Sequence, residues 1–348
     1  MLKILFLTPW YPSTKDAMSG LFVQKHAEAV RAQGVDVRVI HSQTNIDTLR
    51  QYQALQREGW KPDLVQLNVI QKQGLLALAL WQKEHIPYII LEHWSGYLPE
   101  NGSFLRMSAW KQRLYRRIAR EARMILTVSQ RLAQAMQDCG IRNARWGQVH
   151  NVVDDFFYEQ IENRKSKIEN RKTLLHVSCF DEQAKNVTGL LRAAKMLSEK
   201  RQDWRLILVG TGADYEDVRA YADALDIPEG LLQWTGELTP REVADAMHRV
   251  DALVLSSRYE TYGVVLAEAV AAGLPILSTP VGIAEEVADL IVPQEIAQNK
   301  AGTFAEFLEA ILFRVESRKS KVESERFTSE AVGKILKEAY DSCLHRDI

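Results

Sequence analysis

The stretch Asp251–Pro280 reads DALVLSSRYETYGVVLAEAVAAGLPILSTP, and its pattern indicates the class of fold. It begins with a short apolar run bounded by polar residues, as in a buried strand, and continues through residues 263–272, which are rich in helix formers. Gly273 and Pro275 supply the stop signal of that helix, and the residues that follow predict another strand. A strand, a helix and a strand in this order form the repeating unit of a parallel sheet.

Two glutamates, Glu260 and Glu268, flank the point where the strand passes into the helix. Ligands of parallel sheets collect at the carboxyl ends of the strands, where a helix N-terminus offers unpaired N–H groups. The N–H groups of Gly263, Val264 and Val265 therefore suit a phosphate or diphosphate. The carboxylates would repel a phosphate, so they are better suited to hydroxyl groups on either side of it. The alternative is a pair of solvated glutamates near a helix start.

Strand and helix patterns alternate along the whole chain, which predicts the α/β class with doubly wound parallel sheets. We expect further strands at 4–7, 35–40, 64–67, 88–91, 124–128, 173–177, 205–209 and 231–235. We expect further helices at 20–33, 75–84, 108–123, 187–199, 213–225, 240–250 and 329–344. The predicted domains are 1–155 and 173–327, joined by a polar linker at 156–172 and followed by a C-terminal helix in 328–348 that returns to the first domain.

Length and composition agree with two domains, because the chain has 348 residues and 46% of them are hydrophobic. A net charge of −1 gives no basic footprint for nucleic acid. The 3 cysteines are widely separated and lack metal-ligand spacing, which favours a reducing compartment. No signal peptide precedes the first strand and no apolar run is long enough to span a bilayer. We therefore expect a cytoplasmic protein without a bound metal.

At the glutamate pair, the sequence resembles the retaining glycosyltransferases of family 4, also called group 1. Their signature is two glutamates separated by seven residues, with a Phe/Tyr-Gly step after the first, and here it reads Glu260-Thr-Tyr262-Gly263-Val-Val-Leu-Ala-Glu268. Weaker landmarks occur in the expected order at Trp10-Tyr-Pro12, Ser19-Gly20, Thr127-Val-Ser129, Asn151-Val-Val-Asp154, His176–Asn186, Val209–Gly212 and Thr235-Gly236. The resemblance covers nearly the whole chain.

The resemblance implies the GT-B architecture, in which two Rossmann-like domains face a cleft, and a UDP- or GDP-linked sugar as the donor. It assigns Glu268 to the donor ribose, Lys185 to the diphosphate and Gly20 to a loop that approaches the phosphates. From local sequence alone, Lys185 is also consistent with a surface lysine and Gly20 with an ordinary turn glycine. The implied donor-binding residues are Gly20, Lys185, Gly263, Val264, Val265 and Glu268.

The catalytic residues that the resemblance implies are His93, near the reacting sugar, and Glu260, which positions that sugar. It implies no metal or cofactor, because positive side chains and helix dipoles neutralise the leaving diphosphate. Retention by double displacement would need a carboxylate nucleophile, for which Glu260 is the obvious candidate. The resemblance favours attack on the same face as the departing phosphate instead. Isolated histidines such as His93 are otherwise often structural.

The implied reaction is sugar transfer to a hydroxyl of a glycan or glycolipid acceptor. Two positions depart from the family pattern: Cys179 stands where an Arg is usual, and Gly282 is what remains of a Gly-Gly pair. These departures leave open a catalytically idle nucleotide-sugar binding protein. A GT-B sugar-phosphate synthase or phosphorylase is a further alternative.

The segment 104–123 is strongly basic and also contains apolar residues. One interpretation is a helix at an anionic membrane surface, on the inner face of the cytoplasmic membrane, where a lipid-linked acceptor would be reached. The other is a core helix whose basic face is merely solvated. The basic residues are Arg106, Lys111, Arg113, Arg116, Arg117, Arg120 and Arg123.

Overall fold

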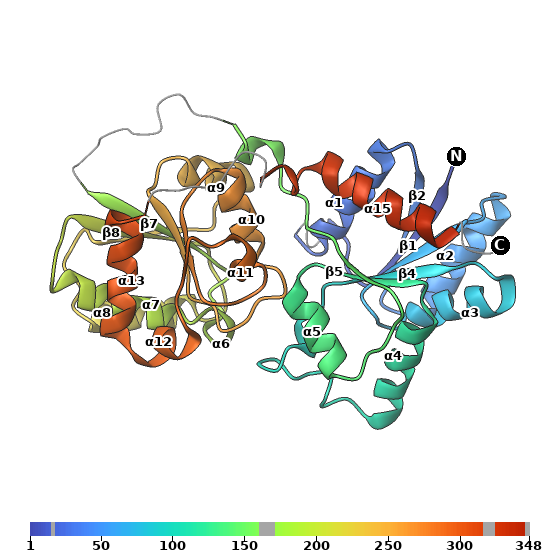
Figure 1. Ribbon diagram of the computed structural model, residues 1–348, viewed down its shortest axis with the longest axis horizontal. Coiled ribbons are helices and arrows are strands. Elements are labelled where there is room, and N and C mark those ends of the chain that lie inside the picture. Colours follow the sequence, from blue (N-terminus) through green and yellow to red (C-terminus); the bar gives the residue numbers. More distant parts are fainter. Residues whose placement is uncertain (15–17, 160–170, 316–323, 345–348) are drawn as a thin grey trace. The chain divides into compact units, whose positions relative to one another are not determined.

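The computed structural model describes residues 1–14, 18–159, 171–315 and 324–344 (Figure 1). The chain divides into two compact units, Met1–Val152 with Arg326–Ile348, and Val153–Glu325. Each unit contains one six-stranded sheet, and all the strand pairs in it are parallel. The predicted α/β class with two doubly wound parallel sheets is therefore confirmed. Most of the expected linker 156–172 lies outside the described residues.

The sheet of the first unit has the strand order β2-β1-β3-β4-β5-β6. Its strands are β1 Lys3–Thr8, β2 Asp36–His41, β3 Leu64–Asn68, β4 Tyr88–Glu92, β5 Met124–Thr127 and β6 Trp146–Gln148. Strand β1 is apolar and buried, and it pairs with β2 on one side and β3 on the other. The chain thus changes direction across the sheet between β1 and β3, which is where a doubly wound sheet opens a crevice at its carboxyl edge.

The helices of the first unit are α1 Leu21–Ala32, α2 Asn45–Arg57, α3 Gly74–Glu84, α4 Ala109–Glu121, α5 Gln130–Asp138 and the C-terminal α15 Ser329–Leu344. Helix α15 packs along α1, the first helix of the chain (Figure 1). Close approach of the two helices requires Gly333, because a Cβ atom there would lie 2.4 Å from the Ala29 carbonyl oxygen. The Tyr340 hydroxyl also donates a hydrogen bond of 2.6 Å to Gln66 Oε1 on β3.

The sheet of the second unit has the order β12-β11-β10-β7-β8-β9. Its strands are β7 Lys172–Val177, β8 Trp204–Val209, β9 Leu232–Gly236, β10 Ala252–Leu255, β11 Ile276–Ser278 and β12 Leu290–Ile291. Its helices are α6 Glu182–Lys185, α7 Val187–Ser198, α8 Tyr215–Ala224, α9 Pro240–Met247, α10 Val264–Ala271, α11 Ala284–Val287, α12 Gln294–Asn299 and α13 Ala301–Phe313. The chain changes direction between β7 and β10, so the loops after these two strands meet at one edge of the sheet.

The two longest helices in the described residues that were not expected from the sequence are α2 and α13. Helix α2 has only Thr48 and Tyr52 as buried residues, so its sequence lacks an apolar stripe, and its start depends on the Thr44 side chain, which accepts the Asp47 N–H. Helix α13 is apolar but has no side-chain cap at its start, Lys300. No helix in the described part of the chain is long and apolar enough to span a membrane.

Candidate functional site

The loops after β7 and β10 bring two predicted site residues into direct contact. Lys185 Nζ lies 2.5 Å from Glu260 Oε1, and the Ser257 hydroxyl donates to the same carboxylate oxygen over 2.9 Å. The Lys185 and Glu260 side chains are 16% and 15% exposed. Burial works to lower the pKa of the Lys185 ammonium, but the charge and hydrogen bond of Glu260 outweigh it and raise that pKa above its ordinary value. Lys185 is therefore held as a cation.

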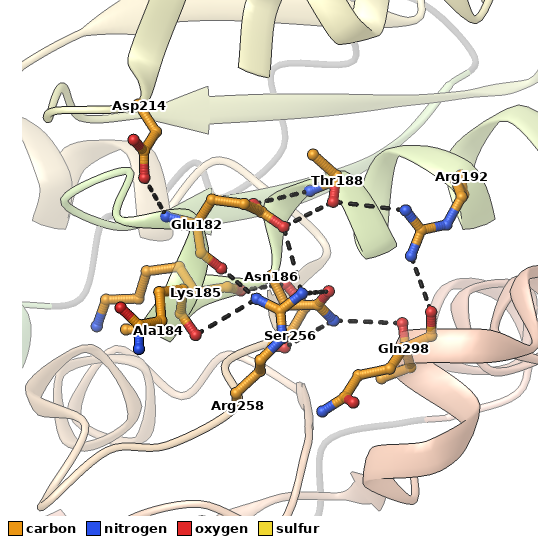
Figure 2. Close-up of polar contacts among 12 residues, drawn as sticks. Glu182, Ala184, Lys185, Asn186, Thr188, Arg192, Asp214, Ser256, Arg258 and Gln298 are labelled. Carbon is orange, nitrogen blue, oxygen red and sulfur yellow. Dashed lines mark hydrogen bonds and ion pairs between the residues drawn. The ribbon is translucent and has the colours of Figure 1, made fainter. Parts of the chain in front are cut away.

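The backbone around Lys185 is fixed by residues that directly follow β10. The Ser256 hydroxyl donates to the Lys185 carbonyl over 3.0 Å, and the Arg258 N–H donates to the Ala184 carbonyl over 2.7 Å. The Arg258 guanidinium also donates to Asn186 Oδ1 over 2.9 Å, as Figure 2 shows. Because Asn186 has a positive φ of 51°, this contact holds the left-handed turn between α6 and α7.

A second set of contacts anchors α6 within its own domain. The Glu182 N–H donates to Asp214 Oδ2 over 2.7 Å, and the Glu182 carboxylate accepts the Thr188 hydroxyl over 2.6 Å (Figure 2). Arg192 on α7 donates to the Gln298 carbonyl over 2.8 Å. Helix α6, which ends in Lys185, is thus tied to the start of α8 through Asp214 and to α7 through Thr188. These contacts restrict where the Lys185 ammonium group can move.

Helix α10 begins beside Glu260 at a backbone position that needs glycine. Gly263 has φ 78°, and a Cβ atom there would lie 2.9 Å from Leu266 Cδ1. The loop after β11 packs against the same turn, since a Cβ atom on Gly282 would lie 2.1 Å from the Tyr262 carbonyl oxygen. Val264 is 41% exposed, so the start of α10 is open to solvent. The first N–H groups of a helix have no partner within the helix and attract anions.

The remaining predicted donor residues take up distinct positions. Val265 lies in the first turn of α10, and Glu268 lies half-buried one turn further along. Gly20 belongs to the first unit, where it begins α1 with φ 67°. A Cβ atom on Gly20 would lie 2.3 Å from the Trp10 carbonyl, so the loop that contains Trp10 packs directly on this glycine. Cys179, in the loop after β7, is an exposed free thiol.

His93 follows β4 of the first unit and is almost fully buried. Its ring lies 4.2 Å from the Phe22 ring and 5.6 Å from the His26 ring, measured between centroids. Within the described part of the chain, His93 Nε2 has no hydrogen-bond partner. Burial, together with the neighbouring His26, lowers the pKa of His93 well below its ordinary value. His93 is therefore a neutral imidazole at physiological pH.

Comparison with known proteins gives the family. The sequence model "Glycosyl transferases group 1" matches residues 158–324, and "Glycosyltransferase Family 4" matches residues 41–155. The chain belongs to the group 1 glycosyltransferases. A curated relative of this glycosyltransferase chain is N-acetyl-alpha-D-glucosaminyl L-malate synthase of Bacillus anthracis, 32% identical over 40% of this chain and 36% of that protein. Another is lipopolysaccharide 1,6-galactosyltransferase of Escherichia coli K12, 32% identical over 24% of this chain and 23% of that protein. The matches span little more than a third of the first relative and less than a quarter of the second.

Solved structures match over a far larger part of this group 1 glycosyltransferase. Sucrose-phosphate synthase from Thermosynechococcus elongatus superposes with a TM-score of 0.75, 17% identity and complete coverage of both chains. Anabaena HepE in complex with UDP and glucose superposes with a TM-score of 0.72 and 18% identity, over 98% of this chain and 100% of that one. At such low identity these similarities concern the fold, and they confirm the GT-B class that the resemblance implied.

The sequence signals miss several residues that shape the site of this glycosyltransferase. Ser256, Ser257 and Arg258 were not expected to have a role, although three polar residues directly after an apolar strand were a usable signal. Glu92 was also missed, and its buried carboxyl group lies at the end of β4. Among the described residues, no group of three or more His, Cys, Asp or Glu side chains is arranged to hold a metal ion.

Proposed function

We propose that this chain is a retaining glycosyltransferase that moves a sugar from a UDP- or GDP-linked donor to a hydroxyl group of a glycan or glycolipid. The observation that carries the proposal is the Lys185–Glu260 contact beside the start of α10. It places a cation suited to phosphate and a carboxylate suited to sugar hydroxyls within reach of a single ligand. The functions of relatives, among them a lipopolysaccharide galactosyltransferase and an alpha-monoglucosyldiacylglycerol synthase, agree with such acceptors.

In this proposal the donor diphosphate lies at the first turn of α10. The N–H groups of Gly263, Val264 and Val265 bind its oxygens, and Lys185 turns from Glu260 to the phosphates. This exchange releases the Glu260 carboxylate for the hydroxyls of the transferred sugar. Glu268, one turn along the helix, binds the ribose. The first unit contributes Gly20 near the phosphates.

The proposed reaction retains the configuration at the anomeric carbon. The acceptor oxygen forms a bond to that carbon on the face from which the phosphate departs, and the carbon–phosphate oxygen bond breaks. The acceptor proton passes to the departing phosphate oxygen. Lys185 and the helix N-terminus stabilise the charge that develops on the diphosphate, in place of a metal ion. His93, as a neutral imidazole, hydrogen-bonds the reacting sugar.

The test is product formation with a panel of UDP- and GDP-sugars and of soluble and lipid-linked acceptors. We expect one donor to give product whose new linkage has the donor's anomeric configuration by NMR, with activity that persists in EDTA. A nucleotide-sugar binding protein would bind a donor without turnover, and a phosphorylase would need inorganic phosphate. Activity that disappears in EDTA and returns with Mg²⁺ would contradict the proposed metal-free mechanism.

We further propose that α4 contacts an anionic membrane surface at the inner face of the cytoplasmic membrane. Trp110 in the first turn of α4 is 62% exposed and Leu105, just before the helix, is 61% exposed, whereas Ile118 and Ala119 further along the helix are buried. Helix α4 therefore has a buried face, where the Tyr88 hydroxyl on β4 donates to the Ile118 carbonyl over 2.6 Å, and a face that is open to solvent. The exposed basic residues on and before it are Arg106, Lys111, Arg113, Arg117 and Arg120.

Two arginines of the basic segment have structural contacts instead. Arg116 donates to the Cys139 carbonyl over 2.8 Å, and the Arg123 guanidinium stacks on the Trp81 ring at 4.9 Å. These contacts support the core-helix interpretation for one face of α4. The exposed face leaves the membrane interpretation open to direct test, because an exposed tryptophan among arginines suits the headgroup region of a bilayer.

A further inference from the structure

Glu92 is the last residue of β4, and its carboxyl group is completely buried. Its Oε1 accepts the N–H groups of His93 over 3.0 Å and Trp94 over 2.9 Å, and its Oε2 accepts the Ile70 N–H over 3.0 Å. A buried carboxyl group is costly unless it is hydrogen-bonded. Three backbone N–H groups, from the loop after β3 and the loop after β4, therefore hold this one carboxyl group in place.

The Ile70 contact holds a strained turn. Val69, directly after β3, is buried and has φ 70°, a conformation that β-branched residues rarely adopt. Its N–H donates to the Leu91 carbonyl over 3.0 Å, and the next N–H, from Ile70, donates to Glu92. Strained residues of this kind persist only where their surroundings fix them, and they concentrate at functional sites.

The other two contacts act on His93. A single oxygen of Glu92 accepts the N–H groups on both sides of the His93 Cα carbon, from His93 itself and from Trp94. The backbone direction at His93, and with it the direction of the imidazole ring, depends on that oxygen. The ring is held between Phe22 and His26, while its Nε2 lacks a partner among the described residues.

We propose that Glu92 is a positioning residue that aims the His93 imidazole by fixing the turns after β3 and β4. The inference rests on the proposed function, because His93 is the residue through which Glu92 would affect the reaction. It predicts that a change at Glu92 lowers the rate of sugar transfer while leaving nucleotide binding unchanged, since Lys185 and Glu268 belong to the other unit.

The experiment is a double-mutant cycle of Glu92→Gln and His93→Ala in the full chain. The probes are UDP-glucose and GDP-mannose for kcat and KM, and UDP and GDP for Kd. We expect Glu92→Gln to reduce kcat by about 100-fold, because misplacing a reacting group by 1 Å costs this much, with Kd unchanged. In the His93→Ala background the same change should reduce kcat little further. An equal loss in both backgrounds would overturn the proposal.

The matched control is Tyr340→Phe, which removes a different buried hydrogen bond of the first unit, from the Tyr340 hydroxyl to Gln66. It should lower stability without a fall in kcat. A readout without turnover is the NMR signal of the His93 ring in histidine-labelled protein. Glu92→Gln should shift that signal and Tyr340→Phe should not. A parent protein that transfers no sugar would refute the proposed function, and an unshifted His93 signal would refute the role of Glu92.

Discussion

Both sheets are six-stranded and parallel, but they carry opposite chemistry at their carboxyl edges. In the second unit, the edge holds a charged pair, Lys185 and Glu260, with both side chains partly exposed. In the first unit it holds His26, His93 and Glu92, which are buried. Burial lowers the pKa of His26 to about 4 and raises the pKa of Glu92 to about 7, so in each case the uncharged form is favoured.

This contrast shows how one fold supplies two kinds of binding surface. A charged pair that keeps some contact with solvent can exchange its internal partner for a charged ligand, because the phosphate and the sugar hydroxyls then replace the contacts that the two side chains lose. A buried neutral group cannot neutralise a phosphate, but it can orient a hydroxyl through a directional hydrogen bond. We therefore propose that Lys185 and Glu260 of the second unit meet the charged donor, and that the buried edge around His93 in the first unit meets uncharged parts of the substrates.

The largest expected effect comes from removing the cation of the second unit. Lys185→Ala should lower kcat/KM by about 10²- to 10³-fold, the usual loss when one group that stabilises developing charge is removed. The matched control is Lys172→Ala, because Lys172 also forms an ion pair, with Asp251 at 2.9 Å, but lies at the start of β7. Equal activity in Lys185→Ala and the parent would contradict the proposed role of this cation, and with it the contrast between a charged second unit and a neutral first unit.

The second effect concerns stability and tests the neutral edge of the first unit. Between its ordinary pKa of 4.5 and about 7, folded Glu92 keeps a proton that the unfolded chain releases. Its contribution to the unfolding free energy is therefore complete below pH 4.5 and is lost as the pH rises through 7. Since Glu92→Gln does not titrate, its stability relative to the parent should increase by roughly 3 kcal/mol from pH 4 to pH 8.

Hydrogen exchange measured across this pH range would follow each unit separately. The increase in stability of Glu92→Gln relative to the parent should be confined to the first unit. Residues of the second unit should exchange as in the parent. A stability difference between Glu92→Gln and the parent that stays constant with pH would show that Glu92 is ionised in the folded protein. Both sheet edges would then carry charged side chains.

A third effect separates the two glutamates of the second unit. Glu268→Ala should weaken binding of free UDP or GDP and of the full donor by roughly 1.5–3 kcal/mol, the value of a hydrogen bond to a charged group. Glu260→Ala should weaken only the full donor. Because it also removes the partner of Lys185, free UDP or GDP should bind at least as tightly as to the parent. Isothermal titration calorimetry distinguishes these outcomes, and unchanged nucleotide affinity in Glu268→Ala would exclude the ribose assignment.

The smallest effect is expected at the surface of the first unit. The protein should sediment with anionic vesicles at low salt and dissociate as salt screens the arginines. Arg113→Glu with Arg117→Glu should weaken binding by about 1 kcal/mol or more per residue. Arg50→Glu with Arg57→Glu on α2 is the control with the same change in charge. Protein that stays in the supernatant with anionic vesicles at low salt would favour a soluble acceptor.

Much of the fold was predictable because its signals are local. The alternation of apolar strands and helices predicted the parallel sheets, and Gly263 between Glu260 and Glu268 marked the start of α10 within a few residues. Helix α2 was not predicted, because a helix that buries so few residues has little hydrophobic periodicity. The family resemblance singled out Lys185 and Glu260, but as residues with separate ligands.

The element types, the parallel sheets and the glutamate signature thus follow from local sequence, since each depends on residues close together in the chain. The contact of Lys185 with Glu260, 75 positions away, is a product of tertiary structure, because it requires β7 and β10 to be neighbours in the sheet. The same holds for Glu92, whose carboxyl group is satisfied by Ile70 from the adjacent strand end. Hydrogen bonds between strand ends depend on which strands pair, and pairing is fixed by the packing of the whole sheet rather than by any local pattern.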